Sequence, residues 1–383
     1  MDKNVIKYIG FYDHQRYVDE NRNFVLSATN KMNYIAKSIV KCGYNVDIIS
    51  PSWSENQKGL YKKRRELLME NIYLQVGSTF GTKNFIMRKI KVIWSLMWLF
   101  FYLCFYVDKE EEIIVYHSMM LIYPVMLAKR IKGFKMILEV EEIYQDVSVF
   151  SKNMNKMEYN MFNIADKYIF STELLNGKIN IKNKPYEVIY GSYDIENINY
   201  NEKFNDNKIH IVYAGIIDKV KGGAFVASKL AAYLSEKFYI HIIGFGNMED
   251  INELERYIYE INKKSDCRIS YDGILKGTDY IKFLRKCDIG LSTQIPEKKY
   301  INTSFPSKIL SYLSNNLRVI SMRIPCVEKS KIGKLLYYYD KQDPIFISNI
   351  IENLKVEDSY NSMQEIKKLD IEFCLKIKKL LES

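Results

Sequence analysis

The stretch Thr303-Ser304-Phe305-Pro306-Ser307-Lys308 joins an expected strand to an expected helix. The short apolar segment Ile289–Ser292 precedes it, and a helix is expected over 309–315. A second apolar segment, 318–321, follows the helix. Strand, loop, helix and strand in this order form one unit of a parallel α/β sheet.

The same stretch has the composition of an anion-binding loop. Backbone N–H groups are unpaired at the start of a helix, and the helix dipole favours negative charge there. Ser307 adds a hydroxyl donor and Lys308 adds a full positive charge, which together predict a phosphate site. The alternative is structural: Thr303 or Ser304 caps the helix, and Lys308 points into water.

Length and composition indicate a folded protein of two domains. The chain has 383 residues, of which 48% are hydrophobic and 27% are charged, and a single core rarely extends over so many residues. Six cysteines are scattered without a CxxC pair, which argues against a zinc site or a disulfide framework. The first ten residues predict no signal peptide, so we expect a cytoplasmic protein. The net charge of +10 suits phosphorylated or anionic partners.

Alternating strands and helices predict two doubly wound α/β domains. The expected organisation is a first domain over 1–191, a linker over 192–207, a second domain over 208–358, and a C-terminal helix within 359–383 that packs back on the first domain. In the first domain, 21–30 is expected to be a loop and 32–42 a helix. Expected strands are 5–9, 46–49, 113–116, 136–140, 168–170 and 187–190 in the first domain, and 209–213, 239–243, 268–271, 288–292, 318–321 and 335–339 in the second. Expected helices of the second domain are 223–236, 248–262, 277–286 and 306–315.

Residues 58–107 combine basic charge with an apolar stretch. Nine Lys and Arg residues lie within 58–91, and 92–107 contains no charge and many aromatic side chains. As a helix, the sixteen residues of 92–107 reach ~24 Å, which is shorter than the ~30 Å hydrocarbon core of a bilayer. The pattern predicts either a buried helix or a helix that lies on an anionic membrane surface.

Further candidate site residues lie at expected strand ends of the second domain. Small residues there let a ligand approach the backbone, and a lysine can contact a phosphate. Any single glycine is also explained if it only allows the backbone to make a tight turn. The candidates are Gly215, Lys221, Gly222, Gly244, Gly246, Tyr271 and Gly273.

Two residues at strand ends of the first domain are candidate acid–base groups. His117 ends one expected strand, and Glu142 follows the next. Each can act in proton transfer, or it can be a structural residue at a strand end. The chain contains no DxD, HExxH, GxSxG or P-loop motif, so we expect neither a metal-held diphosphate nor a zinc, serine-hydrolase or P-loop site.

These motifs together resemble the donor half of GT-B glycosyltransferases, in the large bacterial group related to the retaining enzymes. The resemblance rests on Tyr213-Ala214-Gly215 with Lys221-Gly222, on Gly244-Phe245-Gly246, on Tyr271-Asp272-Gly273, and on the run 303–313 with 318–321. The last run is similar to the FPSK variant of capsule and O-antigen enzymes. The resemblance implies two Rossmann-like domains that face a cleft, with a nucleotide-diphosphate sugar as co-substrate and no other cofactor. Its implied donor-binding residues add Thr303, Ser304, Phe305, Ser307, Lys308 and Ser311 to the second-domain candidates above.

This chain departs from the family where two glutamates are common. Those positions are Thr303 and Ser311, so hydroxyls replace carboxylates, and the sequence does not indicate whether the enzyme retains or inverts the anomeric centre. The implied function is glycosyl transfer to a glycan, on a lipid carrier, in polysaccharide biosynthesis at the cytoplasmic face of the membrane. Lys308, His117 and Glu142 are the implied catalytic residues, and nucleic acid is not an expected partner. Two alternatives stay open: a sugar-nucleotide epimerase with the same frame, and a non-catalytic subunit of a transferase complex.

Overall fold

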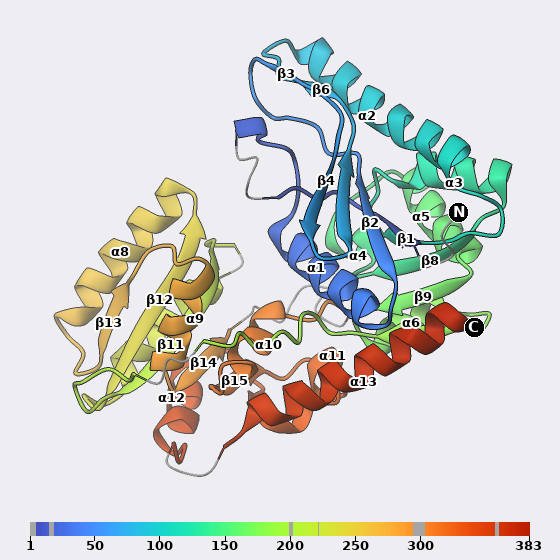
Figure 1. The fold of residues 1–383 in the computed structure, drawn as a ribbon. Coiled ribbons are helices and arrows are strands. Elements are labelled where there is room, and N and C mark those ends of the chain that lie inside the picture. The colour runs from blue at the N-terminus through green and yellow to red at the C-terminus, as the bar shows by residue number, and fades with distance from the viewer. Residues whose placement is uncertain (1–4, 15–18, 199–201, 221, 294–302, 357–359) are drawn as a thin grey trace. The chain divides into compact units, whose positions relative to one another are not determined.

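A computed structural model describes residues 5–14, 19–198, 202–220, 222–293, 303–356 and 360–383. The chain divides into two compact units. Unit 1 comprises Met1–Ser192 and Ile371–Ser383, and unit 2 comprises Tyr193–Asp370. Each unit is built around its own sheet (Figure 1).

Unit 1 contains an eight-stranded sheet in the order β10-β9-β8-β7-β1-β2-β5-β4. Its strand pairs are parallel except for the antiparallel pair of β4 and β5. A small antiparallel pair, β3 with β6, lies outside this sheet. The strands are β1 (Val5–Ile9), β2 (Asn45–Ser50), β3 (Leu60–Tyr61), β4 (Arg64–Met69), β5 (Ile72–Val76), β6 (Thr79–Phe80), β7 (Glu112–Tyr116), β8 (Lys135–Val140), β9 (Lys167–Phe170) and β10 (Tyr186–Val188).

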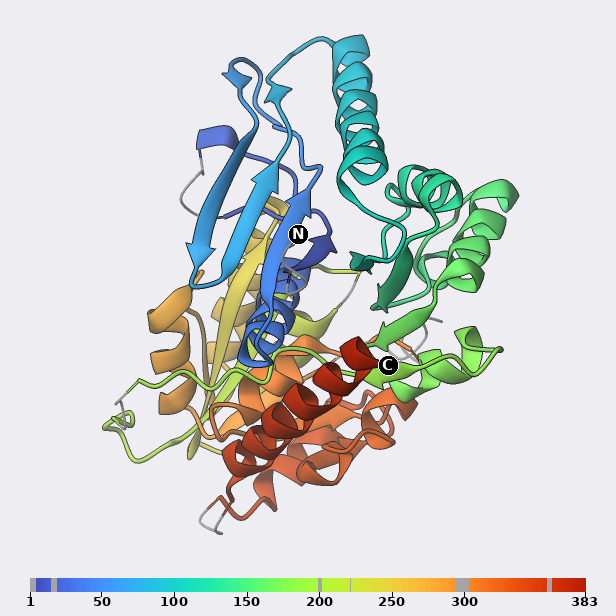
Figure 2. The same ribbon diagram turned by 45° about the vertical axis from the view of Figure 1, so that its right-hand side comes forward.

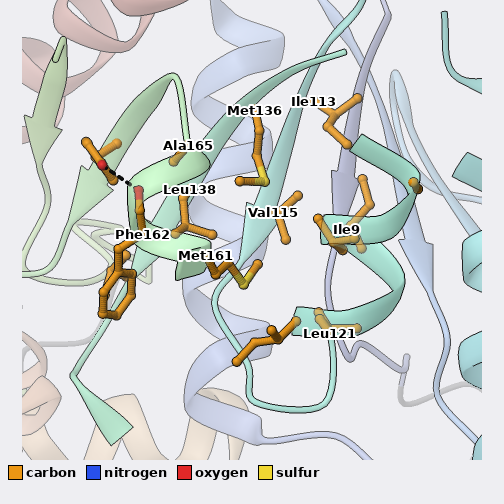
Figure 3. Close-up of a cluster of buried hydrophobic side chains, with 14 of the residues drawn as sticks. Ile9, Ile113, Val115, Leu121, Met136, Leu138, Met161, Phe162 and Ala165 are labelled. Atoms are coloured by element: carbon orange, nitrogen blue, oxygen red, sulfur yellow. Dashed lines mark hydrogen bonds between the residues drawn. The ribbon is translucent and has the colours of Figure 1, made fainter. Parts of the chain in front are cut away.

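The core of unit 1 forms between this sheet and its helices. Buried side chains of β1, β7 and β8 pack against Leu121, Met161 and Phe162 (Figure 3). Burial of this apolar surface stabilises the unit by roughly 25 cal/mol per Å². The helices are α1 (Leu26–Lys41), α2 (Phe85–Tyr106), α3 (Ile122–Lys132), α4 (Tyr144–Val147), α5 (Lys152–Ile164) and α6 (Glu173–Ile179).

Unit 2 contains a six-stranded parallel sheet in the order β13-β12-β11-β14-β15-β16. Strand β11, the first of this unit in the chain, therefore lies in the middle of the sheet. The following strands are added outward on both sides of it, which is the doubly wound Rossmann order. The strands are β11 (Ile209–Ile217), β12 (Phe238–Gly246), β13 (Arg268–Tyr271), β14 (Ile289–Ser292), β15 (Arg318–Met322) and β16 (Leu336–Tyr339). The helices are α7 (Gly223–Lys229), the 3-10 helix η2 (Leu230–Tyr233), α8 (Met248–Asn262), α9 (Gly277–Lys286), α10 (Ser307–Leu313), α11 (Pro325–Glu328), the 3-10 helix η4 (Gly333–Leu335) and α12 (Pro344–Glu352).

The final helix, α13 (Ser362–Glu382), begins in unit 2 and ends in unit 1. Within unit 1, the ring of Phe373 lies 5.8 Å from that of Tyr34 on α1. Lys167 Nζ on β9 donates to the carbonyl oxygen of Leu380 at 2.7 Å. These contacts hold the last three turns of the chain against the unit formed by its beginning.

The structure corrects several predicted element boundaries. Helix α1 begins at Leu26, inside the segment expected to be a loop. Helix α2 has 22 residues and begins at Phe85, because the side chain of Asn84 caps it by accepting from two backbone N–H groups. The hairpin of β4 and β5 was not predicted. Strand β11 extends to Ile217, and α7 ends at Lys229, where the chain tightens into a 3-10 helix.

A buried carboxyl in unit 1 makes stability depend on pH. Burial, and then the negative charge of Glu141, raises the pKa of Glu139 to about 8 from 4.5. The folded state therefore holds a proton between pH 4.5 and 8 that the unfolded state releases, so this contribution to stability falls as pH rises through that window. Tyr8 Oη donates to the same carboxyl group.

We expect Glu139→Gln to raise the melting temperature at pH 8 by at least about 4 °C, with little change at pH 5. Glutamine keeps the shape of the protonated acid and has no charge to lose. Thermal unfolding at both values tests this, with the exposed residue Glu70 changed to Gln as the control. An equal difference from the wild type at the two pH values would contradict the assignment.

Candidate functional site: the carboxyl edge of the unit 2 sheet

The candidate site lies where the winding direction of the unit 2 sheet reverses. Strands β11 and β14 are neighbours, and the chain leaves them toward opposite edges of the sheet. The loops at the carboxyl ends of two such strands separate, and ligands of doubly wound sheets bind in the space this creates. Thr293 follows β14 here, and its Oγ1 donates to the carbonyl oxygen of Gly223 at 2.7 Å.

Lys308 lies in this place, half-buried, with its ammonium group over an aromatic ring. It is the second residue of α10, and its Nζ lies 3.9 Å from the centroid of the Tyr213 ring on β11. The same Nζ is 3.0 Å from the position that a Cβ atom would take on Gly215. The residue before the helix is Pro306, and no side chain caps it. The structural alternative is therefore wrong in having Thr303 or Ser304 cap the helix, and Lys308 contacts the Tyr213 ring.

Tyr312 fixes α10 against the two central strands. Its Oη accepts a hydrogen bond from the backbone N–H of Ala214 at 2.7 Å and donates to the carbonyl oxygen of Leu291 at 3.3 Å. Its ring lies directly over Gly290, where a Cβ atom would come within 2.4 Å. A buried tyrosine whose hydroxyl group is paired costs little to desolvate. Tyr312 therefore sets where Lys308 stands, a role that the sequence motif did not reveal.

Two glycines at this edge are required by close backbone packing. A Cβ atom on Gly244 would lie 1.8 Å from the carbonyl oxygen of Gly215, and one on Gly246 would lie 2.2 Å from that of Ile217. The N–H of Gly244 donates to the carbonyl oxygen of Gly273 at 2.9 Å. Tyr271 Oη donates to the carbonyl oxygen of Gly244 at 3.0 Å. The predicted residues Gly244, Gly246, Tyr271 and Gly273 thus lie with Gly215 at the same edge of the sheet.

The remaining predicted donor residues differ in exposure. Gly222 adopts a left-handed conformation, with φ of 66°, immediately before α7, while Lys221 lies outside the described residues. Thr303 and Phe305 are buried, whereas Ser307 is exposed and Ser304 is partly exposed. Ser311 Oγ lies 3.0 Å from Tyr280 Oη. Thr303 is thus buried in this structure, whereas Ser304, Ser307 and Ser311 keep accessible surface.

In unit 1, His117 is inside the protein. Both of its ring nitrogens are buried, and the ring lies 5.1 Å from that of Tyr144 and 4.9 Å from that of Phe162. Its Nε2 is 3.4 Å from a carboxylate oxygen of Glu158. Burial lowers the pKa of His117 to about 3, so the ring is neutral at physiological pH. This geometry fits a positioning residue better than a group that touches an acceptor.

Glu142 lies two residues beyond the end of β8 and is partly exposed. Of the two acid–base candidates, Glu142 therefore keeps accessible surface, whereas His117 is buried. Among the residues that the structure describes, no three His, Cys, Asp or Glu side chains are grouped so that they could hold a metal ion. Metal independence stays a prediction.

Comparison with known proteins identifies the fold. No family model matches the sequence, and no curated protein matches it. Solved structures match over nearly the whole chain. The E. coli trehalose-6-phosphate protein bound with UDP-2-fluoro glucose is 10% identical, with a TM-score of 0.67 over 96% of this chain and 95% of that one. HepE from Anabaena in complex with UDP-glucose is 13% identical, with a TM-score of 0.65 over 99% of both chains.

Sucrose-phosphate synthase from Thermosynechococcus elongatus is 11% identical, with a TM-score of 0.67 over 99% of this chain and 98% of that one. These neighbours are GT-B glycosyltransferases. The predicted fold class, GT-B with two Rossmann-like domains, is therefore confirmed. At these identities the likeness establishes the fold and leaves the activity to be argued from the site.

Proposed function

We propose that this protein is a glycosyltransferase that moves a sugar from a nucleotide-diphosphate sugar to a glycan acceptor. The observation that carries the proposal is the position of Lys308. Its ammonium group stands beside Gly215, at the carboxyl end of the central strand, where the sheet changes winding direction. A cation held at the carboxyl end of a central strand suits the binding of a diphosphate. HepE, which shares the fold, was solved with UDP-glucose, which makes uridine donors the first to test.

The proposed mechanism is electrostatic. Negative charge grows on the leaving diphosphate as the glycosidic bond breaks, and an ammonium group held in place beforehand stabilises that charge. The Tyr213 ring face, 3.9 Å from Nζ, attracts the cation and keeps it near Gly215. Ser307 is exposed at the start of α10 and offers a hydroxyl donor to the same phosphates. Ser311, beside Tyr280, is proposed to contact the ribose.

The acceptor is proposed to be a glycan on a lipid carrier, in the synthesis of a bacterial surface polysaccharide at the cytoplasmic side of the membrane. A lipid-linked acceptor requires the enzyme to work at a membrane surface, and residues 58–107 are proposed to contact it. Glu142 is proposed as the acid–base group on the acceptor side, with His117 supporting its surroundings. The sequence resemblance to capsule and O-antigen enzymes supports this finer assignment.

A transfer assay with labelled sugar nucleotides tests the function. The full-length protein is incubated with each donor, with and without extracted lipid-linked glycans. We expect label to move to the lipid fraction for one donor only when the acceptor is present. Conversion of the donor into its epimer without acceptor would indicate the epimerase alternative. Absence of donor binding across the panel would favour the non-catalytic subunit.

Chelation provides a separate prediction. The sequence lacks a DxD pair, so we expect lysine and backbone N–H groups to hold the diphosphate. Transfer activity in the presence of EDTA should therefore stay within about twofold of the untreated rate, because no metal charge would be lost. The measurement is the initial rate with EDTA and after addition of Mg²⁺ or Mn²⁺. Complete loss that either metal restores would overturn the prediction.

A further inference from the structure

Helix α2 exposes much of its apolar surface, although its buried side includes polar residues. A helix at a protein surface turns its apolar side inward, but α2 buries Lys91 and Ser95 along with Leu99, Tyr102 and Leu103. Lys91 Nζ donates to the backbone carbonyl oxygen of Ser54. Ten large apolar residues of α2 are exposed. Seven of them form a stripe in which positions 86, 90, 93–94, 97, 101 and 105 follow one another at helical spacing: Ile86, Ile90, Ile93, Trp94, Met97, Phe101 and Phe105. Phe85, Met87 and Tyr106, at the two ends of the helix, are exposed as well.

This stripe runs the length of a helix at the outside of unit 1 (Figures 1 and 2). The side chains of Phe105, Ile93 and Trp94 are 75%, 57% and 51% exposed. Helix α3 packs against α2 and adds Tyr123, Leu127 and Ile131, which are also exposed. So large an exposed apolar surface marks a place where something binds.

Basic residues surround the N-terminal end of the stripe. Strand β3 pairs with β6 directly before α2, and Gly81 N–H donates to the carbonyl oxygen of Gly59, which brings the 58–63 segment beside the start of the helix. Leu60, at its tip, is 87% exposed. Six exposed cations gather in these segments: Lys58, Lys62, Lys63, Lys83, Arg88 and Lys89.

We propose that the exposed side of α2, with the basic segments before it, docks on an anionic lipid surface and lies in its headgroup layer. Aromatic and aliphatic side chains would enter the boundary between headgroups and acyl chains, while the lysines and arginines contact lipid phosphates. The six cations are the reason to choose an anionic lipid surface as the partner, because their charge matches that of lipid phosphates. A second copy of this chain that packed α2 parallel to its counterpart would bring two such sets together, and dimer formation is an outcome of the test below. Membrane docking itself does not depend on the proposed function. Only its purpose does, which is to bring the donor site to a lipid-linked acceptor.

The topology excludes a membrane span. With 22 residues, α2 is ~33 Å long and sufficient to cross a bilayer, and it is the one helix among the described residues with the length and composition of a span. However, β5 before it and β7 after it belong to the same sheet. Both ends of α2 therefore stay with one folded unit, and Leu99 and Leu103 are part of its core.

Vesicle flotation tests the proposal with the full-length protein. We expect binding to vesicles of phosphatidylcholine with phosphatidylglycerol at low salt, and at least about 10-fold weaker binding in high salt or to phosphatidylcholine alone. The double variant Ile93→Glu/Phe105→Glu should lose about 10-fold or more in vesicle affinity. Leu375→Glu, at a 68% exposed apolar position on α13 in the same unit, is the matched control and should bind as the wild type does.

Fluorescence and sedimentation separate the remaining outcomes. Trp94 emission should shift to the blue on anionic vesicles, and Trp94→Phe should remove most of that shift. Wild-type affinity in the double variant, or a lipid-independent dimer that the double variant breaks, would overturn the proposal. Sugar-nucleotide binding, measured without vesicles, should be unchanged in every variant. Its absence from the wild type would reject the proposed function and leave the vesicle result standing.

Discussion

Lys308→Ala should lower kcat/KM by ~10- to 200-fold without unfolding the protein. A hydrogen bond to a charged group contributes ~1.5–3 kcal/mol, and each 1.36 kcal/mol is tenfold in rate. Part of the interaction strengthens as charge develops on the leaving group, so kcat should fall together with affinity. Steady-state kinetics on the purified variant, with its melting temperature recorded, gives this result.

Two further variants sharpen the interpretation. Lys308→Arg should recover only part of the activity, because a planar guanidinium group does not reproduce an ammonium group beside Gly215. Ser311→Ala should have a smaller effect, since it removes one contact to the ribose. If Lys308→Ala keeps wild-type kinetics in a folded protein, the donor diphosphate does not bind at α10.

Gly244→Ala should cause the largest loss of stability among single changes at the site. The added methyl group would lie 1.8 Å from the carbonyl oxygen of Gly215, and φ at this residue is 148°. Relief of such an overlap requires β11 and β12 to separate at their carboxyl ends, which costs about 3 kcal/mol or more. We expect the melting temperature of unit 2 to fall by about 6–12 °C and donor binding to be lost.

Gly273→Ala is the matched control for backbone strain alone. Gly273 has φ of 76°, and nothing lies within 4 Å of the position of its Cβ. A left-handed conformation costs a residue with a Cβ atom about 1–2 kcal/mol, so the expected fall in melting temperature is about 2–8 °C. Calorimetry of the two variants gives the comparison. Equal losses would show that the contact between Gly244 and Gly215 is not the cause.

The sequence predicts the strands of unit 2 well because they are apolar and bounded by glycine or polar residues. It misses the last residues of β11 and β12, which continue to Ile217 and Gly246. Helix α8 is predicted at its observed bounds, Met248–Asn262, and in the structure the side chain of Asn247 caps its start. The hairpin of β4 and β5 is not predicted, because Arg64, Arg65 and Glu66 hide a strand that buries only part of its surface. The start of α2 is missed for a related reason. The helix begins at Phe85, but Arg88, Lys89 and Lys91 separate its first apolar residues from the uncharged stretch that begins at residue 92.

For the site, the sequence identifies the loop but not its partners. The order of serine, lysine and helix in the chain is sufficient to place Lys308 near the start of α10. The contact of Lys308 with the Tyr213 ring, and the hydroxyl of Tyr312 that fixes α10, depend on residues about 95 positions apart. No local pattern encodes such contacts. His117 is predicted from its strand end, yet its burial follows from the packing of Tyr144 and Phe162.

The most direct test of the central claim is calorimetric titration of a panel of nucleotide-diphosphate sugars into the wild-type protein and into Lys308→Ala. We expect that at least one donor binds the wild type and that its affinity falls by about tenfold or more in the variant. The corresponding nucleoside monophosphate should bind more weakly and should distinguish little between the two proteins, because it lacks the diphosphate that Lys308 contacts. Absence of donor binding, or equal affinity in wild type and Lys308→Ala, would contradict the account.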